Sequence, residues 1–384
     1  MNTGKAGRIV AAAIFMASLV SCNFSFGNKP GEYESDEPGE TVGSSWDVLT
    51  PLHSRYTGQF LLGNIISPLD LNTVRFNLLK RHFNTVTAEN AMKPDAIQYQ
   101  RGQFTYPDTM VNAVLEAGMQ MHGHTLVWHS QTPLWMNTGV SREQAITNMT
   151  NHITQVLTNF QGKVVSWDVV NEAMRNDASP STDWRLSLRK NENPAQSENS
   201  RWNQIIGDEY IELAFKAARD ADPAAKLYYN DYNLNMSNPN KAYAVYRMVK
   251  DINERCPAYG GRKLIDGIGM QSHHHLNTDP ATVEESIQLF ASLGVEIAIS
   301  ELDIQAVFYG SPYSSFTEDA AKAQAQKYAA LFIIFKKYAA NISRVTFWGI
   351  DDATSWRKES FPVLFDKQYK AKPAFYAVEN PNKY

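Results

Sequence analysis

The chain has 384 residues, of which 43% are hydrophobic and 20% are charged. This composition is ordinary for a globular protein and excludes disorder for most of the chain. The formal net charge is −4, and the sequence holds no Lys/Arg cluster of the kind that follows a phosphate backbone, so nucleic acid is excluded as an expected partner.

The N-terminus has the pattern of an export signal. Two basic residues precede an apolar run over residues 9–20, which is too short to span a bilayer as a helix but has the size of a signal-peptide core. We therefore interpret residues 1–21 as a lipoprotein signal peptide, because the run ends in LVSC, which resembles a bacterial lipobox. Cys22 would then be acylated and anchor an exported protein to the bacterial membrane, on the periplasmic or the cell-surface side. In an ordinary cleavage site Cys22 would be incidental.

The segment after the signal is rich in Gly, Pro, Ser and acidic residues and has almost nothing to bury. We interpret residues 22–44 as a flexible tether. No second linker interrupts residues 45–384, although residues 177–201 form a long polar loop, so we predict one domain there. The other cysteine, Cys256, has no partner once Cys22 is acylated, and we expect no disulfide framework.

Short apolar runs alternate with longer segments of helical period in this domain, which is typical of βα units around a parallel sheet. Predicted helices include residues 143–160 and 318–338. Eight such units predict an α/β fold, a single (β/α)₈ TIM barrel, which commonly takes about 250 to over 400 residues. The predicted strands cover residues 60–66, 83–88, 119–128, 164–170, 226–229, 265–270, 296–300 and 345–350.

Polar side chains follow most of the predicted strands. Because the chemistry of these barrels gathers at the C-terminal ends of the strands, we expect these side chains to line one mouth. They are Glu89, Asn90 and Lys93, then His122, His124 and His129, Asn171 and Glu172, Asn230 to Asn233, Gln271 to His273, Glu301 and Asp303, and Trp348.

Glu172 and Glu301 each close an apolar run and would face this mouth. Glycoside hydrolysis requires two carboxyl groups that flank a bond, since one protonates the leaving oxygen while the other attacks or activates water. A lone glutamate at a strand end is more often a rim salt-bridge residue. Two of them, after the fourth and seventh strands, favour a glycosidase.

His122 and His124 point the same way on a strand and could hold a metal ion, as in barrel-fold metal-dependent hydrolases. The further ligands would be His273 and Asp303, yet the glutamates are the best-placed groups of those strands, and no His-x-x-x-His or Cys cluster supports a metal cage. We therefore expect neither a metal nor a cofactor. In the histidine run 273–275 alternate side chains point apart, so at most two could share a ligand. Tryptophans at or beyond strand ends could line a sugar site or pack in the core, and the sequence leaves both readings open.

Four ordered stretches resemble glycoside hydrolase family 10, the retaining β-1,4-xylanases. They are TAENAMKP at 87–94, HGHTLVWH at 122–129, WDVVNEA at 167–173 and ISELD at 299–303, and the similarity runs from about Leu52 to Ala377. The resemblance implies an enzyme that hydrolyses internal bonds of xylan by two displacements through a glycosyl-enzyme intermediate. Xylan and xylo-oligosaccharides would be its substrates, and residues 45–384 its catalytic domain.

The resemblance also implies roles for individual residues. Glu172 would be the acid/base and Glu301 the nucleophile, oriented by His273, which Asp303 would hold. The remaining implied contacts are Asn171 to the sugar 2-hydroxyl, His124 and Gln271 in the same subsite, Glu89, Asn90 and Lys93 to the next sugar on the non-reducing side, Trp128, Trp348 and Trp356 around the reacting sugar, and Gln131 and Tyr232 on the glycone wall. The chain departs from the family pattern in a longer loop over 176–202 and in His274 and His275.

Two other functions remain open at this point. One is a barrel glycosidase that acts on β-1,4-glucan. The other is a non-catalytic glycan-binding lipoprotein, which would not need a paired acid and nucleophile. We expect the protein to be a monomer.

Overall fold

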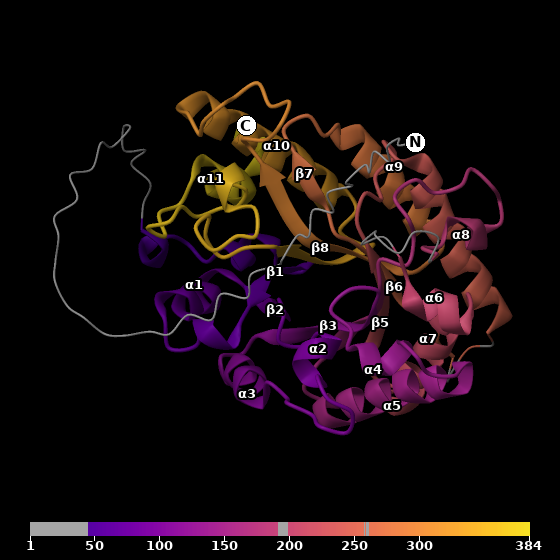
Figure 1. Cartoon of the computed structure of the whole chain (residues 1–384). Coiled ribbons are helices and arrows are strands. Elements are labelled where there is room, and N and C mark those ends of the chain that lie inside the picture. The colour runs from indigo at the N-terminus through magenta and orange to yellow at the C-terminus, as the bar shows by residue number, and fades with distance from the viewer. Residues whose placement is uncertain (1–44, 191–198, 257, 259–260) are drawn as a thin grey trace, which may run out of the picture. The chain divides into compact units, whose positions relative to one another are not determined.

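The computed structural model describes residues 45–190, 199–256, 258 and 261–384 (Figure 1). The predicted signal peptide, the tether and the Cys22 lipidation site lie outside the described residues, as does part of the loop at 176–202. None of the helices in the described ranges combines the length and the apolar character that a membrane span needs. Cys256 is buried and forms no disulfide with any described residue.

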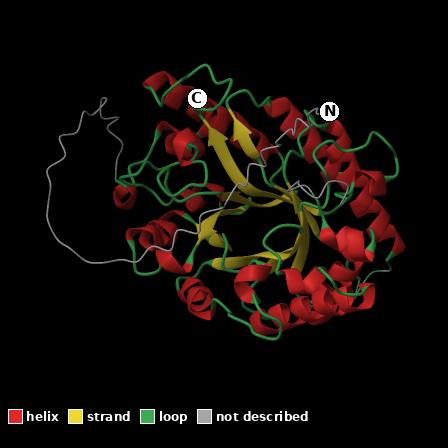
Figure 2. Cartoon of the chain, in the orientation of Figure 1, coloured by secondary structure: helices red, strands yellow, loops and turns green. Residues whose placement is uncertain are grey.

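Parallel strands form a closed ring in the described part of the chain, with helices around it (Figure 2). Neighbours in the ring follow the chain order, and β9 pairs with β1 to close it. The predicted (β/α)₈ barrel is therefore confirmed. Its strands are β1 (Leu61–Ile66), β2 (Thr85–Ala88), β3 (Gln120–Trp128), β4 (Ser166–Asn171), β5 (Lys226–Asp231), β6 (Gly267–Met270), β8 (Glu296–Gln305) and β9 (Ile342–Phe347).

The surrounding helices begin where side chains can cap them. Ser141 accepts a hydrogen bond from the backbone N–H of Gln144 at the start of α5, and Thr317 accepts one from Ala320 at the start of α10. Such caps satisfy backbone donors that have no partner inside the helix. The α-helices are α1 (Val74–His82), α2 (Pro94–Ile97), α3 (Asp108–Glu116), α4 (Leu134–Asn137), α5 (Arg142–Phe160), α6 (Arg201–Ile206), α7 (Tyr210–Ala221), α8 (Pro239–Arg255), α9 (Pro280–Ala291), α10 (Glu318–Lys337) and α11 (Pro373–Glu379). Short 3₁₀ segments are η1 (Trp46–Val48), η2 (Leu52–Tyr56), η3 (Pro68–Asp70), η4 (Trp184–Ser187), η5 (Lys358–Ser360) and η6 (Pro381–Lys383).

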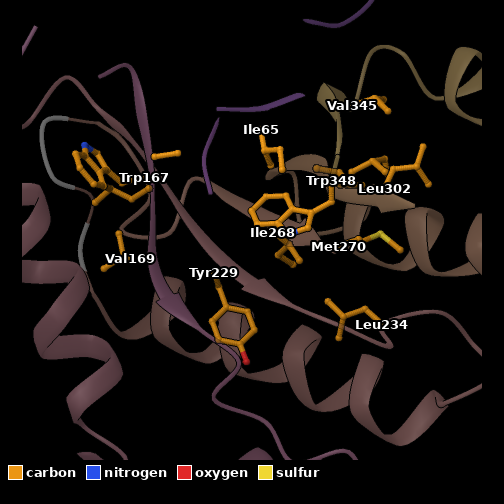
Figure 3. Close-up of a cluster of buried hydrophobic side chains, with 14 of the residues drawn as sticks. Ile65, Trp167, Val169, Tyr229, Leu234, Ile268, Met270, Leu302, Val345 and Trp348 are labelled. Carbon is orange, nitrogen blue, oxygen red and sulfur yellow. The ribbon is translucent and has the colours of Figure 1, made fainter. Parts of the chain in front are cut away.

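Successive side chains of each strand point alternately outward, into the core beneath the helices, and inward, into the barrel. Trp167 of β4 is buried and packs against Phe160 of α5, as part of the apolar cluster in Figure 3. Its ring covers Gly123 of β3 so closely that a Cβ there would lie 2.1 Å from it, which requires glycine. Because neighbouring side chains point to opposite faces, His122 and His124 on either side of Gly123 turn away from this layer.

The largest difference at a single strand end lies at the C-terminal end of the seventh barrel strand. β8 runs to Gln305, five residues beyond the predicted end, so Glu301 and Asp303 lie within the strand. The extension has a partner that was not predicted, the short strand β7 (His273–His275), whose His273 pairs with Asp303. The longer β8 and the presence of β7 both depend on pairing between segments that are far apart in the sequence.

Candidate active site

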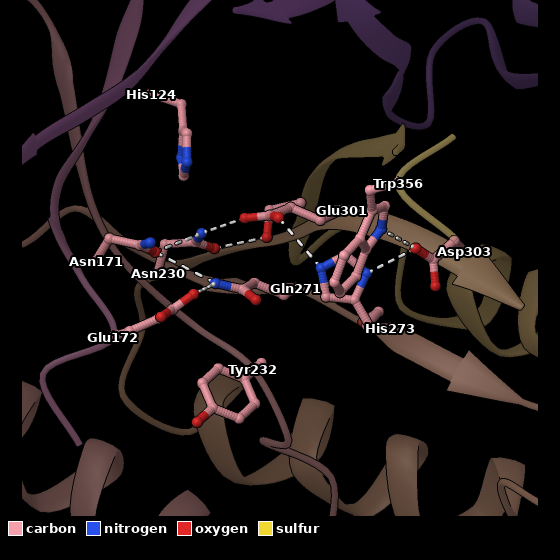
Figure 4. A network of polar contacts seen from close by, with 12 residues as sticks. His124, Asn171, Glu172, Asn230, Tyr232, Gln271, His273, Glu301, Asp303 and Trp356 are labelled. Atoms are coloured by element: carbon pink, nitrogen blue, oxygen red, sulfur yellow. Dashed lines mark hydrogen bonds and ion pairs between the residues drawn. The ribbon is translucent and has the colours of Figure 1, made fainter. Parts of the chain in front are cut away.

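The two glutamates of the predicted pair meet in one polar network at the strand ends (Figure 4). Gln271 donates through Nε2 to Glu172 Oε1 at 2.9 Å, and Asn230 donates through Nδ2 to Glu301 Oε1 at 2.7 Å. The same two amide nitrogens also reach Asn171 Oδ1, at 3.3 and 3.0 Å. Three amide side chains therefore bridge the two carboxyl groups.

Glu301 lies in a charged environment. Its side chain is buried, and Oε2 is 3.2 Å from His273 Nε2. His273 Nδ1 is 2.9 Å from Asp303 Oδ2 on the other side. Burial lowers the pKa of His273, but the carboxylates of Asp303 and Glu301 outweigh it and raise this pKa to about 9. His273 is therefore an imidazolium at neutral pH and donates to both carboxylates.

The ion pairs of His273 predict that the stability of the fold depends on pH. The pKa of His273 is about 9 in the folded protein, against about 6.5 in an unfolded chain, so the folded state holds an extra proton between these values. The stabilisation is complete below pH 6.5 and is lost as the pH rises through 9. Denaturant titrations of the wild type and of His273→Gln should show the wild type losing on the order of 1–3 kcal/mol more free energy of unfolding between pH 6 and 9. Parallel pH profiles would contradict the assignment.

Glu172 lies in a different environment. It follows β4 directly, with a left-handed backbone (φ 54°) that is uncommon for a residue with a side chain. Neutral groups hold its carboxyl group, since Trp128 Nε1 donates to Oε2 at 3.0 Å and Gln271 donates to Oε1. An imidazolium beside Glu301 and neutral donors beside Glu172 give the two groups the unequal surroundings that separate roles require.

A second cluster lies next to the pair. Lys93 donates through Nζ to Asn90 Oδ1 at 2.8 Å and to Gln131 Oε1 at 2.9 Å, and it stands 5.0 Å from the Trp128 ring centroid. Burial lowers the pKa of Lys93 in spite of nearby carboxylates. Burial likewise raises the pKa of Glu89, against the effect of Lys93. The structure thus brings together the side chains predicted to contact the next sugar.

His122 and His124, considered as metal ligands, share a carboxylate instead. His122 Nε2 is 3.1 Å from Asp168 Oδ1, and His124 Nδ1 is 2.9 Å from Asp168 Oδ2. The described residues contain no group of three or more His, Cys, Asp or Glu side chains arranged to hold a metal ion. Asp168 was not predicted as a site residue, and its only signal in the sequence is a single acidic residue within an apolar strand. His124 also meets the Trp348 ring edge to face, at a centroid distance of 5.4 Å.

The three predicted wall tryptophans differ in exposure. Trp348 is 7% exposed and belongs to the core cluster, whereas Trp356 is 56% exposed and stands on the rim. Trp356 donates through Nε1 to Asp303 Oδ2 at 2.9 Å, so its edge is fixed while its ring remains accessible. Trp128 is held against Glu172. All three side chains therefore lie at the site, and only Trp356 offers a large exposed surface.

Tyr232 and Gln131, which were predicted to share one wall, belong to different clusters. Gln131 contacts Lys93, whereas Tyr232 accepts a hydrogen bond from Arg189 Nη2 at 2.8 Å. Arg189 also donates through Nε to the Glu172 carbonyl oxygen at 2.7 Å, which places Tyr232 on the Glu172 side of the network. Arg189 was not predicted as a site residue, because it lies in a polar loop with no motif around it.

A parallel barrel that gathers paired carboxyl groups, amides and aromatic rings at its C-terminal strand ends is a barrel glycoside hydrolase. Residues 52–381 match the profile of glycosyl hydrolase family 10, and the chain belongs to this family. The resemblance seen in the sequence motifs is confirmed.

Several characterised proteins are similar to the chain. Endo-1,4-beta-xylanase A from Thermotoga maritima is 41% identical over 82% of this chain and 29% of its own length. The endo-1,4-beta-xylanase of Geobacillus stearothermophilus is 36% identical over 86% of this chain and 98% of its own. The crystal structure of an intracellular xylanase from Thermoanaerobacterium saccharolyticum is 37% identical, with a TM-score of 0.76 over 86% of this chain and 99% of its own. Variants of that xylanase have been solved with xylotriose and xylotetraose. The chain thus spans less than a third of the Thermotoga relative and nearly all of the other two.

Proposed function

We propose that the chain is an endo-acting retaining glycosidase that hydrolyses internal β-1,4-xylosidic bonds of xylan. The observation that carries the proposal is the pair of Glu172 and Glu301, bridged by amide side chains at the mouth of a family 10 barrel. The xylanase names of the similar proteins and the xylo-oligosaccharide complexes of one of them support the choice of substrate.

Glu301 is the nucleophile in this proposal and Glu172 the acid/base. A Glu301 oxygen attacks the anomeric carbon while Glu172 protonates the departing glycosidic oxygen, which forms a glycosyl ester and releases the leaving sugar. Glu172 then accepts a proton from water, the water oxygen attacks the anomeric carbon, and the Glu301 ester bond breaks. Two inversions at this carbon retain the β configuration. His273, held by Asp303, orients Glu301 for the attack.

The amide network supports the role proposed for Asn171. Its Oδ1 accepts from Asn230 and Gln271, which leaves the amide nitrogen to donate to the sugar 2-hydroxyl. This contact strengthens in the transition state. The proposed contacts to the next sugar are Glu89, Asn90 and Lys93, with Gln131 beside them. The proposed walls of the cleavage subsite are His124, Gln271, Trp128, Trp348, Trp356 and Tyr232.

The choice of sugar tests the proposal. The buried Trp348 and the Trp356 ring bound a site that should have no room for the hydroxymethyl group of a glucoside. An apolar pocket distinguishes one small group by about 10–200-fold, so aryl β-xylobioside should exceed aryl β-cellobioside in kcat/KM by at least about tenfold. Equal rates would replace the proposal with a β-1,4-glucanase. Binding of both sugars without hydrolysis would point to a glycan-binding lipoprotein.

We further propose that the enzyme is exported and held at the membrane by lipid on Cys22. The support is the lipobox-like LVSC at residues 19–22. More than one acyl chain gives stable anchoring, whereas a single chain is marginal. Cys22→Ala should therefore move most of the xylanase activity from the membrane pellet to the soluble fraction, and metabolic labelling with palmitate should be lost. The idea fails if the variant pellets with membranes as the wild type does.

A further inference from the structure

A buried arginine, Arg189, holds the backbone around Glu172, and no hydrogen bond or ion pair from it to either carboxyl group occurs within the described ranges. Glu172 has a left-handed backbone, which only surrounding contacts can hold in a residue that is not glycine. Arg189 Nε donates to the Glu172 carbonyl oxygen at 2.7 Å, and the Arg189 backbone N–H donates to the Ala173 carbonyl oxygen at 2.9 Å. Arg189 itself is 2% exposed, in spite of its place in a polar loop.

A second set of contacts fixes the next two backbone N–H groups. Ala173 and Met174 both donate to the hydroxyl oxygen of Tyr229, at 3.0 and 3.2 Å. Tyr229 in turn donates to Asp231 Oδ2 at 2.5 Å, and Asp231 Oδ1 is 2.8 Å from Lys241 Nζ. Burial and then Asp231 raise the pKa of Tyr229 well above its usual value, so its hydroxyl keeps the proton that it donates.

Tyr229, Asp231 and Lys241 form a series of linked side chains that is inaccessible to substrate. All three side chains are 0% exposed, which means that their charges and hydroxyl group act only on the protein. Burying a charge costs free energy unless the charge is paired. Here the buried ion pair of Asp231 and Lys241 accepts a hydrogen bond from the Tyr229 hydroxyl, and the Tyr229 hydroxyl oxygen in turn accepts from the backbone that follows Glu172. Lys241 also lies 3.6 Å from the ring centroid of Tyr232, whose hydroxyl accepts from Arg189, so the two sets of contacts are joined.

Other side chains than Arg189, Tyr229 and Lys241 hold the Glu301 carboxyl group. Its contacts are Asn230 and His273, and no hydrogen bond or ion pair to Glu301 from Arg189, Tyr229 or Lys241 occurs among the described residues. Loss of the contacts that Arg189 and Tyr229 make with the backbone of residues 172–174 should therefore disturb proton transfer by Glu172. It should leave nucleophilic attack by Glu301 largely intact. A general fault in folding would affect both.

We propose that Arg189, together with the buried Tyr229–Asp231–Lys241 chain, is a positioning device that aims the Glu172 carboxyl group at the leaving-group oxygen. The inference rests on the proposed function, in which Glu172 is the acid. It adds a residue from the loop over 176–202, and a buried ion pair, to the groups on which proton transfer depends.

Two aryl β-xylobiosides separate this role from a structural one. Dinitrophenolate leaves without a proton, whereas phenolate needs the acid, and general acid catalysis contributes about 10²–10⁴-fold. In Arg189→Met, kcat/KM for the phenyl glycoside should fall at least about tenfold, while that for the 2,4-dinitrophenyl glycoside stays within about threefold. Tyr229→Phe, a smaller change that provides the same test should Arg189→Met not fold, should shift the ratio in the same direction by at least about threefold.

The matched control is Arg219→Met. Arg219 is equally buried, at 2% exposed, and donates to the Ala225 carbonyl oxygen at 2.7 Å and to Asp266 at 2.5 Å, away from both glutamates. Its variant should leave the ratio of the two substrates unchanged, even if it is less stable. Equal losses on both substrates in Arg189→Met and Tyr229→Phe, or no loss on either, would overturn the inference. A wild type that hydrolyses neither glycoside would overturn the proposed function, and the inference with it.

Discussion

Glu301→Ala should lose at least about 10⁴-fold in kcat on every xyloside, including those with good leaving groups. The reason is that no other described group is placed to form the glycosyl ester, since the other side chains around Glu301 are amides, a histidine and the Asp303 that holds it. Steady-state kinetics on 2,4-dinitrophenyl β-xylobioside would measure the loss, because the first step on this substrate does not depend on Glu172.

A control on the same strand separates chemistry from folding. Glu296 lies at the opposite end of β8 and pairs with Lys226 at 2.7 Å. Glu296 also accepts a hydrogen bond from the Tyr228 hydroxyl. Glu296→Ala should keep kcat within about threefold even if the fold is less stable, since a partly exposed ion pair contributes little and neither residue of the pair forms a hydrogen bond or ion pair with Glu172 or Glu301 among the described residues. Substantial turnover in a purified, folded Glu301→Ala variant would show that Glu301 is not the nucleophile.

Glu172→Ala should lose about 10²–10⁴-fold on xylan, where the departing sugar needs a proton. The first step should survive on a dinitrophenyl glycoside, and the glycosyl-enzyme should then accumulate, because no base activates water. Azide is a nucleophile that needs no base and fits the space of the missing carboxyl group. Added azide should therefore restore turnover, and the product should be the β-glycosyl azide.

The isosteric variant Glu172→Gln provides the matched comparison. Its amide can neither donate nor accept the catalytic proton, but it still fills the space, so azide should restore much less activity. Proton NMR of the azide product distinguishes the anomers. An α-azide from Glu172→Ala, or a β-azide from Glu301→Ala, would reverse the two assignments.

The barrel could be predicted because its strands are apolar runs between segments of helical period, a pattern set by local burial. The ends of strands depend on pairing, which is why β8 was predicted to stop at Ser300. Its last residues, Glu301 to Gln305, alternate between polar and apolar side chains, and they extend along β7 and, at Leu302, along β9. Neither segment alone contains that information.

Some residues of the site could likewise be predicted from the sequence and others could not. Residues at strand ends, such as Asn171 and Gln271, could be predicted to converge, because the barrel brings all C-terminal strand ends to one face. Asp168 was missed since its position within an apolar run indicates core packing. Arg189 was missed because a charged residue in a polar loop is usually exposed, and only the folded loop buries it.

Covalent trapping tests the central claim most directly. A 2-deoxy-2-fluoro-β-xylobioside with a dinitrophenyl leaving group should form the glycosyl-enzyme quickly and release it slowly, because fluorine destabilises the oxocarbenium-like transition states while the leaving group favours the first step. Mass spectrometry of the inactivated protein and of its peptides should find one disaccharide per chain, esterified to Glu301. Label on another residue, or no adduct together with an inverted product from the natural substrate, would contradict the account.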